Sequence, residues 1–585
     1  MEFTEYKKDI ISIILLLTIS ATILYTLLNI DMKMGVYYIH DVYSYLNNAL
    51  AFAGLGGSSK NHGLSPLIPF LTSLFFRLGF VSDKTILIVS GVFYIFTALG
   101  MYGLLRIRFN ELLSFTGSIV LLTFPINIAW VSKGMLDIPG LAMSIWAIYL
   151  MALGLYKNPK YYYLAFPVLI LGFFTRYTVI LTLPAMIMLI FFTGNPLDYI
   201  YNHLGKLLKG ILSGIISLAI VLGLYRIYNI PFFFISQSSS ISATSNPTAS
   251  QAVSTSTAAA TVNNVLYYLD NIPLYLGTRK WIPYSFKPGK YLFNKLVWIG
   301  NNPSILSYIF MAIILIGIIL YLYQLLNRYN RGKILKKRDK YFYAKVILFI
   351  IPLIFYFISF TKVSLYTSIL LITVSVLALF RLIRKADLKY MAIDFMFIYW
   401  GLVNITFYSY HIIKTDRYAI TFTPVLAYMI VLGLYLIYMK LKDLEISEKT
   451  LNTIKVLIPM LLIIGSLGYT GYCIGENSPH TFDNRMPQDI MEASDNQRAV
   501  TDWLINYDKD YKNKEIWADD WSGIAFNLRM DVNNTASYKN QSNFTTVLLK
   551  NNVDYYIAEG KNENISSEHY KIIKEEGNIV LYKRI

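Results

Sequence analysis

The sequence is short of charged residues and of cysteine. Only 15% of its 585 residues are charged, whereas an ordinary soluble domain carries roughly 25%. The single cysteine, Cys473, excludes intramolecular disulfides and any cysteine-based zinc site or iron–sulfur cluster. Hydrophobic residues make up 55% of the chain and the mean hydropathy is +0.47. Long uncharged stretches need a bilayer around them, so the composition predicts a membrane protein and excludes collagen-like and disordered classes.

The net positive charge of the chain comes entirely from its first part. The net charge is +17, yet residues 476–585 hold 13 Lys and Arg against 18 Asp and Glu. We therefore place a domain boundary after residue 475, between a basic membrane domain (1–475) and a mildly acidic tail (476–585). The densest basic run, Arg328–Lys345, lies between two apolar stretches. It is typical of a cytoplasmic loop under the positive-inside rule, and we expect no nucleic-acid partner.

Thirteen stretches are apolar and approach the length of about 20 residues that crosses a bilayer. The segment 64–80 carries two prolines and is either a further span or a helix on the membrane surface. Placing it on the surface puts the basic connectors on one side, with the N-terminus inside and the C-terminus outside. The predicted spans are 10–30, 85–105, 112–131, 138–156, 161–175, 177–193, 210–229, 304–326, 343–361, 363–382, 391–411, 417–439 and 453–475.

The outer face then holds two long loops and the tail. The loop 31–84 carries amphipathic helices beside the membrane, and the loop 230–303 contains a Ser/Thr-rich stretch that we interpret as a mobile segment over a site. The tail alternates helical and strand-like pieces and predicts a small extracytoplasmic α/β domain, with helices in 498–507 and 545–552 and strands in 514–520, 553–560 and 578–585. Glycosylation sequons in the tail, among them those at Asn533, Asn543 and Asn564, agree with an outside location.

Four ionisable residues at the outer ends of spans are candidates for function. Asp41 stands in a segment rich in aromatic residues, and no helix start there requires it as an N-cap. Asp137 precedes Pro139 at the start of a span, where it is either functional or an N-cap. Arg176 interrupts an apolar run of about 30 residues and costs several kcal/mol unless it is paired or reaches an interface. Arg417 lies at a similar boundary, where a local pair with Asp416 is the structural alternative.

Further polar residues stand on the same predicted face. Lys133 and His62 are cations that, with Arg176 and Arg417, could surround Asp41 and hold a phosphate ester beside a general base. A loop lysine is more often simply solvated. We also expect Tyr45 and His40 to contact the acceptor or the sugar.

With these residues in view, the chain resembles the GT-C glycosyltransferases that use lipid-phosphate-linked sugars, in particular the protein O-mannosyltransferases and the lipid A aminoarabinose transferases. No single motif is diagnostic, and the order and spacing of the motifs carry the resemblance. The matching segments are HDVYSYLNNAL, NHGLSPLIPFLTSLFFRLGF, VSKGMLDIPGLAMSIWAIYLMALGL, LAFPVLILGFFTRYTVILTLPA and DRYAITFTPVLAYMI.

The resemblance implies a GT-C-like fold and a role for three of these residues. Asp41 matches the catalytic aspartate of the first outer loop, Asp137 the aspartate at the start of the fourth span, and Arg176 the basic residue that contacts the lipid phosphate. The family often has an acidic residue after the catalytic aspartate, where this chain has Val42. Relatives often have a Lys-Pro-Pro or His-Pro-Pro run where this chain has His62-Gly63-Leu64.

The predicted function is inverting transfer of a sugar from a polyprenyl- or dolichyl-phosphate donor to a lipid, glycan or protein acceptor on the outer face of a prokaryotic plasma membrane. Asp41 acts as the base and the cations stabilise the leaving phosphate. No nucleotide motif is present, and Asp41 with Asp137 could hold a divalent cation such as Mg²⁺ or Mn²⁺. A transporter or lipid flippase is the alternative class, and a polysaccharide ligase or polymerase that uses lipid-linked oligosaccharides is another.

Overall fold

The structure is a computed structural model of the 585-residue chain. It describes residues 2–34, 40–58, 64–193, 195–228, 266–278, 303–331, 341–384, 388–411, 415–444, 446–477, 487–535 and 538–585.

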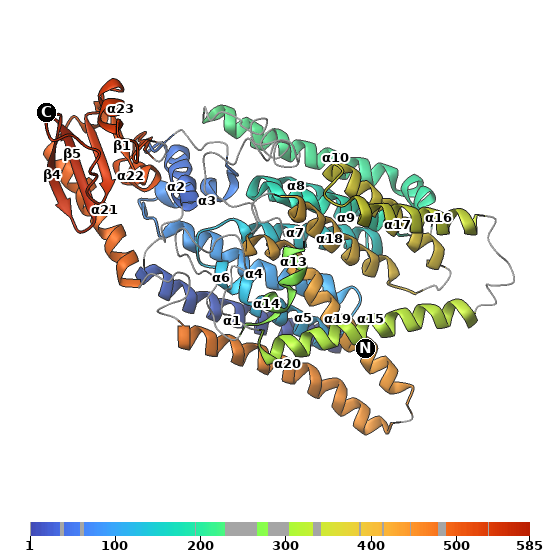
Figure 1. Cartoon of the computed structure of the whole chain (residues 1–585). Helices are drawn as coiled ribbons and strands as arrows, with labels where there is room; N and C mark the ends of the chain where they lie inside the picture. Colours follow the sequence, from blue (N-terminus) through green and yellow to red (C-terminus); the bar gives the residue numbers. More distant parts are fainter. Residues whose placement is uncertain are drawn as a thin grey trace.

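Long apolar helices run side by side through most of the molecule (Figure 1). Ten helices of the described part are long and apolar enough to cross a membrane, and a bilayer favours helices because each backbone polar group is bonded within its own segment. The long helices are α1 (Glu2–Met34), α4 (Thr85–Arg106), α7 (Asp137–Tyr156), α10 (Pro196–Ile227), α15 (Ile305–Arg331), α16 (Phe342–Ser359), α17 (Leu365–Ile383), α18 (Met391–Tyr410), α19 (Thr423–Lys442) and α20 (Glu448–Asn477).

Shorter helices complete the membrane part. They are α2 (His40–Ala53), α3 (Leu67–Arg77), α5 (Glu111–Thr123), α6 (Pro125–Trp130), η1 (Pro159–Tyr161), α8 (Tyr162–Thr175), η2 (Tyr177–Leu181), α9 (Thr182–Phe191), α13 (Tyr267–Asp270), α14 (Ile272–Leu276) and η5 (Asp416–Phe422). The helix α3 is 11 residues long, about 16 Å, so it is too short to cross a bilayer of about 30 Å. The predicted span 112–131 is broken at Phe124, because Pro125 starts a new helix, α6.

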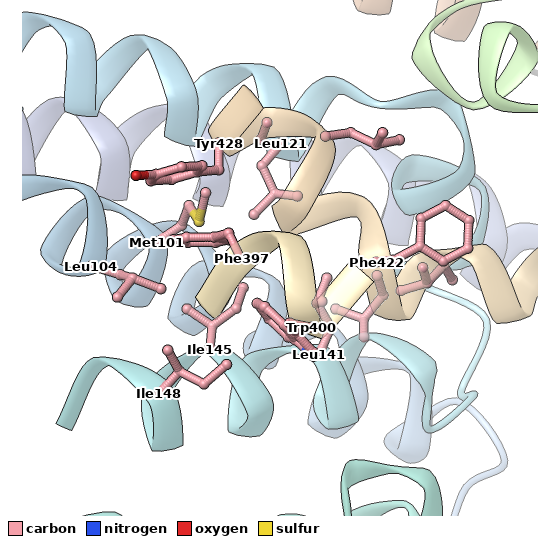
Figure 2. Packing of buried hydrophobic residues seen from close by; sticks show 14 of the residues in the cluster. Met101, Leu104, Leu121, Leu141, Ile145, Ile148, Phe397, Trp400, Phe422 and Tyr428 are labelled. Carbon is pink, nitrogen blue, oxygen red and sulfur yellow. The ribbon is translucent and has the colours of Figure 1, made fainter. Parts of the chain in front are cut away.

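The interior of the bundle is packed by large apolar side chains from α4, α5, α7, α18 and α19. Figure 2 shows Met101 and Leu104 of α4 beside Ile145 and Ile148 of α7, with Trp400 of α18 close to them. Phe397 and Tyr428 stack at 3.8 Å between ring centroids. The helices α16 and α10 instead expose much of their apolar surface, as expected of helices that face lipid.

The C-terminal residues form a small α/β unit at one end of the bundle (Figure 1). Its sheet has the order β2-β1-β3-β5-β4, with β1 parallel to β2 and β3 and with β5 antiparallel to β3 and β4. The elements are α21 (Pro487–Tyr507), η6 (Tyr511–Asn513), β1 (Ile516–Ala518), α22 (Trp521–Leu528), β2 (Asn533–Asn534), α23 (Phe544–Lys550), β3 (Tyr555–Glu559), β4 (Tyr570–Glu576) and β5 (Ile579–Arg584). The predicted helices and strands of the tail are all present, and the prediction missed α22, β2 and β4.

Candidate active site

The helix α2 carries Asp41 in its first turn and lies between the membrane bundle and the C-terminal unit. Residues 42–50 of this helix are all buried. The Asp41 side chain is the exception, with 39% of its surface exposed. A buried helix with one accessible carboxylate at its start holds that carboxylate in a fixed place while leaving it open to a ligand.

Three faces of α2 have three different neighbours. Val42 is fully buried and packs near Gly134, where a Cβ would lie 3.0 Å from Val42 Cγ1. Tyr43 contacts Phe526 of the C-terminal unit, with 5.8 Å between ring centroids. Asp41 and Tyr45 are four residues apart and share the remaining face. The position at which relatives often carry a second carboxylate therefore points into apolar packing in this chain.

Asp41 forms an ion pair with Arg417, a residue 376 positions further along the chain. Both terminal nitrogens of Arg417 donate to Asp41 Oδ2, at 3.2 and 3.3 Å. Arg417 lies in η5, the short 3-10 helix that precedes α19. Asp416 takes different partners, because its carboxylate accepts hydrogen bonds from the hydroxyls of Tyr267 (2.8 Å) and Tyr275 (3.1 Å). The local Arg417–Asp416 pair considered from the sequence is thus replaced by two separate interactions.

Asp137 forms a second ion pair with Arg176. Asp137 is the first residue of α7, and neither of its carboxylate oxygens accepts a hydrogen bond, so its side chain does not cap that helix. Arg176 stands in extended backbone between α8 and η2, and its Nε donates to Thr178 Oγ1 at 3.0 Å. One turn after Asp137, a Cβ at Gly140 would lie 3.0 Å from Arg176 Cβ. The absence of a side chain at Gly140 leaves room for Arg176 to reach Asp137.

The two ion pairs differ in burial and therefore in how easily they open. The side chains of Asp137 and Arg176 are 2% and 13% exposed, whereas those of Asp41 and Arg417 are 39% and 21% exposed. Exposed pairs contribute about 0–1 kcal/mol, while removing one partner of a buried pair costs about 3–5 kcal/mol. The Asp137–Arg176 pair is therefore the more costly of the two to break, and the Asp41–Arg417 pair is the less costly.

Aromatic rings connect the two arginines. The Cζ atoms of Arg176 and Arg417 lie 5.7 and 5.6 Å from the centroid of the Tyr418 ring. Tyr418 stacks on Tyr408 of α18 at 4.9 Å, and Arg417 also lies 6.0 Å from the ring of Trp130. The negative face of an aromatic ring attracts a guanidinium group, so these rings hold two like charges near each other. No sequence pattern marks Trp130 or Tyr408 as site residues, although Tyr418 directly follows Arg417.

The charges of both ion pairs, Asp41–Arg417 and Asp137–Arg176, act on the Tyr45 hydroxyl. Burial raises the pKa of its hydroxyl above the ordinary value, and the carboxylates of Asp41 and Asp137 act in the same direction. The guanidinium groups of Arg417 and Arg176 oppose this shift. Tyr45 therefore keeps its proton near neutral pH, and it can donate a hydrogen bond but cannot serve as a base.

Lys133 is engaged elsewhere. Its ammonium group is 7% exposed and pairs with Asp31, which also accepts a hydrogen bond from Ser132. Burial lowers the pKa of Lys133, and the Asp31 carboxylate opposes this change. Lys133 is thus neither solvated nor joined with Asp41 or Asp137 in an ion pair. Its buried pair with Asp31 fastens the end of α1 to the loop before α7.

Two predicted residues lie partly or wholly outside the described structure. His62 falls outside the described residues, and so does the side chain of His40, whose backbone begins α2. Within the described residues no group of three or more His, Cys, Asp or Glu side chains could hold a metal ion. Asp41 and Asp137 each pair with a different arginine, and a divalent cation at these carboxylates stays a prediction.

Comparisons with known proteins bear on this arrangement. The family model for dolichyl-phosphate-mannose-protein mannosyltransferase matches residues 61–212, a segment that contains Asp137 and Arg176 but not Asp41 or Arg417. No curated protein matches the sequence.

Among solved structures, ArnT from Cupriavidus metallidurans bound to undecaprenyl phosphate matches with a TM-score of 0.53 at 8% identity, over 98% of both chains. The apo state of the same ArnT gives 0.47 at 10% identity, over 98% of this chain and 97% of that one. The archaeal oligosaccharyltransferase AglB from Archaeoglobus fulgidus gives 0.45 at 11% identity, over 92% of this chain and 69% of that one. The likeness to the first ArnT structure shows the fold, and with the family segment it confirms the resemblance drawn from the sequence.

Proposed function

We propose that this chain, a membrane glycosyltransferase of GT-C fold, moves a sugar from a polyprenyl- or dolichyl-phosphate to an acceptor hydroxyl on the extracytoplasmic face, with inversion at the anomeric carbon. The observation that supports this proposal is the pairing of an accessible carboxylate, Asp41, with an exchangeable guanidinium, Arg417, beside the fixed Arg176–Asp137 pair.

In the proposed reaction the donor phosphate competes with Asp41 for Arg417. Because a partly exposed pair opens at a cost of about 1 kcal/mol, the singly charged phosphodiester of the donor can take Arg417 and leave Asp41 as a free carboxylate. Arg417 then becomes the main phosphate ligand. Arg176 stays on Asp137 and contributes positive charge from a fixed position.

The chemical step then needs no other reactant. Asp41 accepts the proton of the acceptor hydroxyl, whose oxygen attacks the anomeric carbon from the side opposite the phosphate. The new carbon–oxygen bond forms while the bond from the anomeric carbon to the phosphate oxygen breaks, so the sugar is inverted. The electron pair of the broken bond stays on the lipid phosphate, which gains a second negative charge; Arg417 binds that phosphate, and Arg176 stabilises it from its place on Asp137. Tyr45 donates a hydrogen bond to the sugar or the acceptor.

A transfer assay on the purified full-length chain in lipid nanodiscs tests the proposal. Polyprenyl phosphates that carry radiolabelled hexoses or pentoses are the donors, and a membrane extract supplies acceptors. We expect label on an acceptor with wild-type protein and loss of transfer by about 100- to 10,000-fold with Asp41→Asn, while the exposed Asp502→Asn serves as the matched control. Full activity of Asp41→Asn contradicts the assignment. Label transferred only from lipid-linked oligosaccharides would indicate a ligase or polymerase instead.

A further inference from the structure

The C-terminal unit touches the same helix that carries Asp41. The contact has two parts. The helix α22 packs along α2, and the loop 54–58 that follows α2 lies against Arg529 of the C-terminal unit. Figure 1 shows α22 beside α2 and α3 at the end of the bundle. The C-terminal unit therefore packs against α2, the helix that carries the proposed base, although in the sequence it follows α20.

Asn47 makes the central polar contact of this interface. Its amide nitrogen donates to the carbonyl of Tyr43, one turn back, and to the carbonyl of Ser522 in α22, both at 2.9 Å. Its amide oxygen accepts from the backbone nitrogen of Ser58 at 3.1 Å. Asn47 is 1% exposed, so both of its N–H groups and its carbonyl are used in a buried place. One side chain thereby ties α2 to the loop after it and to the C-terminal unit.

The loop after α2 fits closely against the same unit. Ser58 Oγ donates to Asp531 Oδ1 at 2.7 Å. At Gly56 the backbone φ is +93°, and a Cβ there would lie 2.3 Å from the carbonyl oxygen of Arg529, so only glycine fits without a shift of the two backbones. The middle of the loop therefore lies against the C-terminal unit, and its last residue is hydrogen-bonded to that unit.

An apolar contact supports the polar ones. Phe526 of α22 is 9% exposed, and it packs with the core of the membrane bundle. Its ring lies 5.8 Å from Tyr43 and 6.4 Å from Phe76 of α3. Arg498 of α21 adds an ion pair to Asp83 at 3.4 Å. The interface is therefore tightly packed as well as hydrogen-bonded.

We infer that the C-terminal unit positions the catalytic carboxylate, and that Asn47 is the positioning residue through which it does so. Asn47 lies six residues after Asp41, which is about 9 Å along a rigid helix. A shift or rotation of α2 at Asn47 therefore moves Asp41 with little attenuation. Misplacement of a catalytic group by about 1 Å can cost on the order of 100-fold in rate. The inference rests on the proposed role of Asp41 as the base.

The test compares Asn47→Ala with Asn404→Ala in the full-length protein. Asn404 is also 1% exposed and also donates to the carbonyl one turn back, Trp400, at 2.9 Å, but it lies on α18 and does not bridge to the C-terminal unit. We measure kcat, the KM for the donor, and hydrogen exchange of the peptide that covers residues 40–53. Ser58→Ala, which removes the bond to Asp531, is the milder second variant if Asn47→Ala does not fold.

We expect Asn47→Ala to lower kcat by about 10- to 100-fold, to leave the donor KM within about twofold, and to speed exchange in α2. We expect Ser58→Ala to change both quantities in the same direction to a smaller extent, and Asn404→Ala to leave α2 exchange at the wild-type rate. Unchanged α2 exchange in Asn47→Ala overturns the inference, and so does faster exchange with wild-type kcat. If the wild-type protein transfers no sugar, the proposed function fails, whereas the exchange data still decide whether the unit holds α2.

Discussion

Arg417 directs both of its terminal nitrogens at one oxygen of Asp41, at 3.2 and 3.3 Å, instead of forming one bond to each oxygen. A guanidinium that spans both oxygens of a carboxylate makes the stronger, bidentate pair. The single-oxygen arrangement, together with its exposure, fits a pair that a phosphate can replace.

Substitution of Arg417 is predicted to weaken donor binding. A hydrogen bond to a charged group contributes about 1.5–3 kcal/mol, which corresponds to roughly 10- to 150-fold in KM for the donor. Arg417→Lys keeps the charge but loses the planar fork, so we expect the smaller loss, and Arg417→Gln the larger one. Steady-state kinetics with varied donor concentration measure both. Arg226→Gln, an exposed position, is the control, and an unchanged donor KM in Arg417→Gln argues against the phosphate role.

Breaking the buried Asp137–Arg176 pair is predicted to lower the stability of the protein in the first place. Asp137→Asn leaves Arg176 buried without its counter-ion and should lower the free energy of unfolding by about 3–5 kcal/mol. The double substitution Asp137→Leu with Arg176→Met removes both charges and should recover most of that loss. Thermal unfolding in detergent follows stability, and the transfer assay follows activity. A double variant that is as unstable as Asp137→Asn would show that the charge pair itself is not the cause.

Gly140 is predicted to tolerate no large side chain. A Cβ at position 140 would lie only 3.0 Å from Arg176 Cβ and 3.2 Å from its Cδ. Gly140→Val should therefore push Arg176 away from Asp137. We expect a loss of transfer of more than 10-fold and a destabilisation of about 1–3 kcal/mol. Gly205→Val is the matched control, since a Cβ there meets no atom within 4 Å. Equal effects at the two glycines would trace the loss to helix propensity instead.

Tyr45 is predicted to act only as a protonated hydroxyl. Burial raises its pKa, so its proton stays bound as the pH rises past the ordinary tyrosine value of about 10. Tyr45→Phe should therefore lower kcat by about 10-fold through the lost hydrogen bond and leave the alkaline limb of the pH–rate profile where it is. A shift of that limb in Tyr45→Phe would show that Tyr45 ionises during the reaction.

Much of the membrane fold follows from hydropathy alone, and its exceptions have local causes. The stretch 112–131 is uniformly apolar, so its break before Pro125 is visible only if proline is weighed against hydropathy. In the tail, β4 was missed because its exposed, charge-rich sequence reads as a loop. That strand lies at the edge of the sheet, where charged side chains are common. The helix α22 was missed because it is only eight residues long and seven of them are buried, which leaves no polar face to mark a helix.

The candidate site was predictable residue by residue but not in its pairing. Asp41, Asp137, Arg176 and Arg417 each stand out as ions at the end of an apolar stretch, and the structure gathers all four around Tyr45. Which arginine meets which aspartate depends on helix packing across 376 residues in one case, and no local pattern encodes that. The ion pair of Lys133 with Asp31 was not foreseen, because Asp31 directly follows the predicted first span and nothing near it indicates its partner.

The three-sided burial of α2 has a consequence for protein engineering. Residues 40–58 and residues 487–585 are far apart in the sequence, yet they share Asn47, Ser58, Phe526 and Asp531 as one interface. A chimera that exchanges only the C-terminal unit between two such enzymes would join mismatched halves of that interface. Hybrids should therefore transplant both segments together, as a single discontinuous cassette.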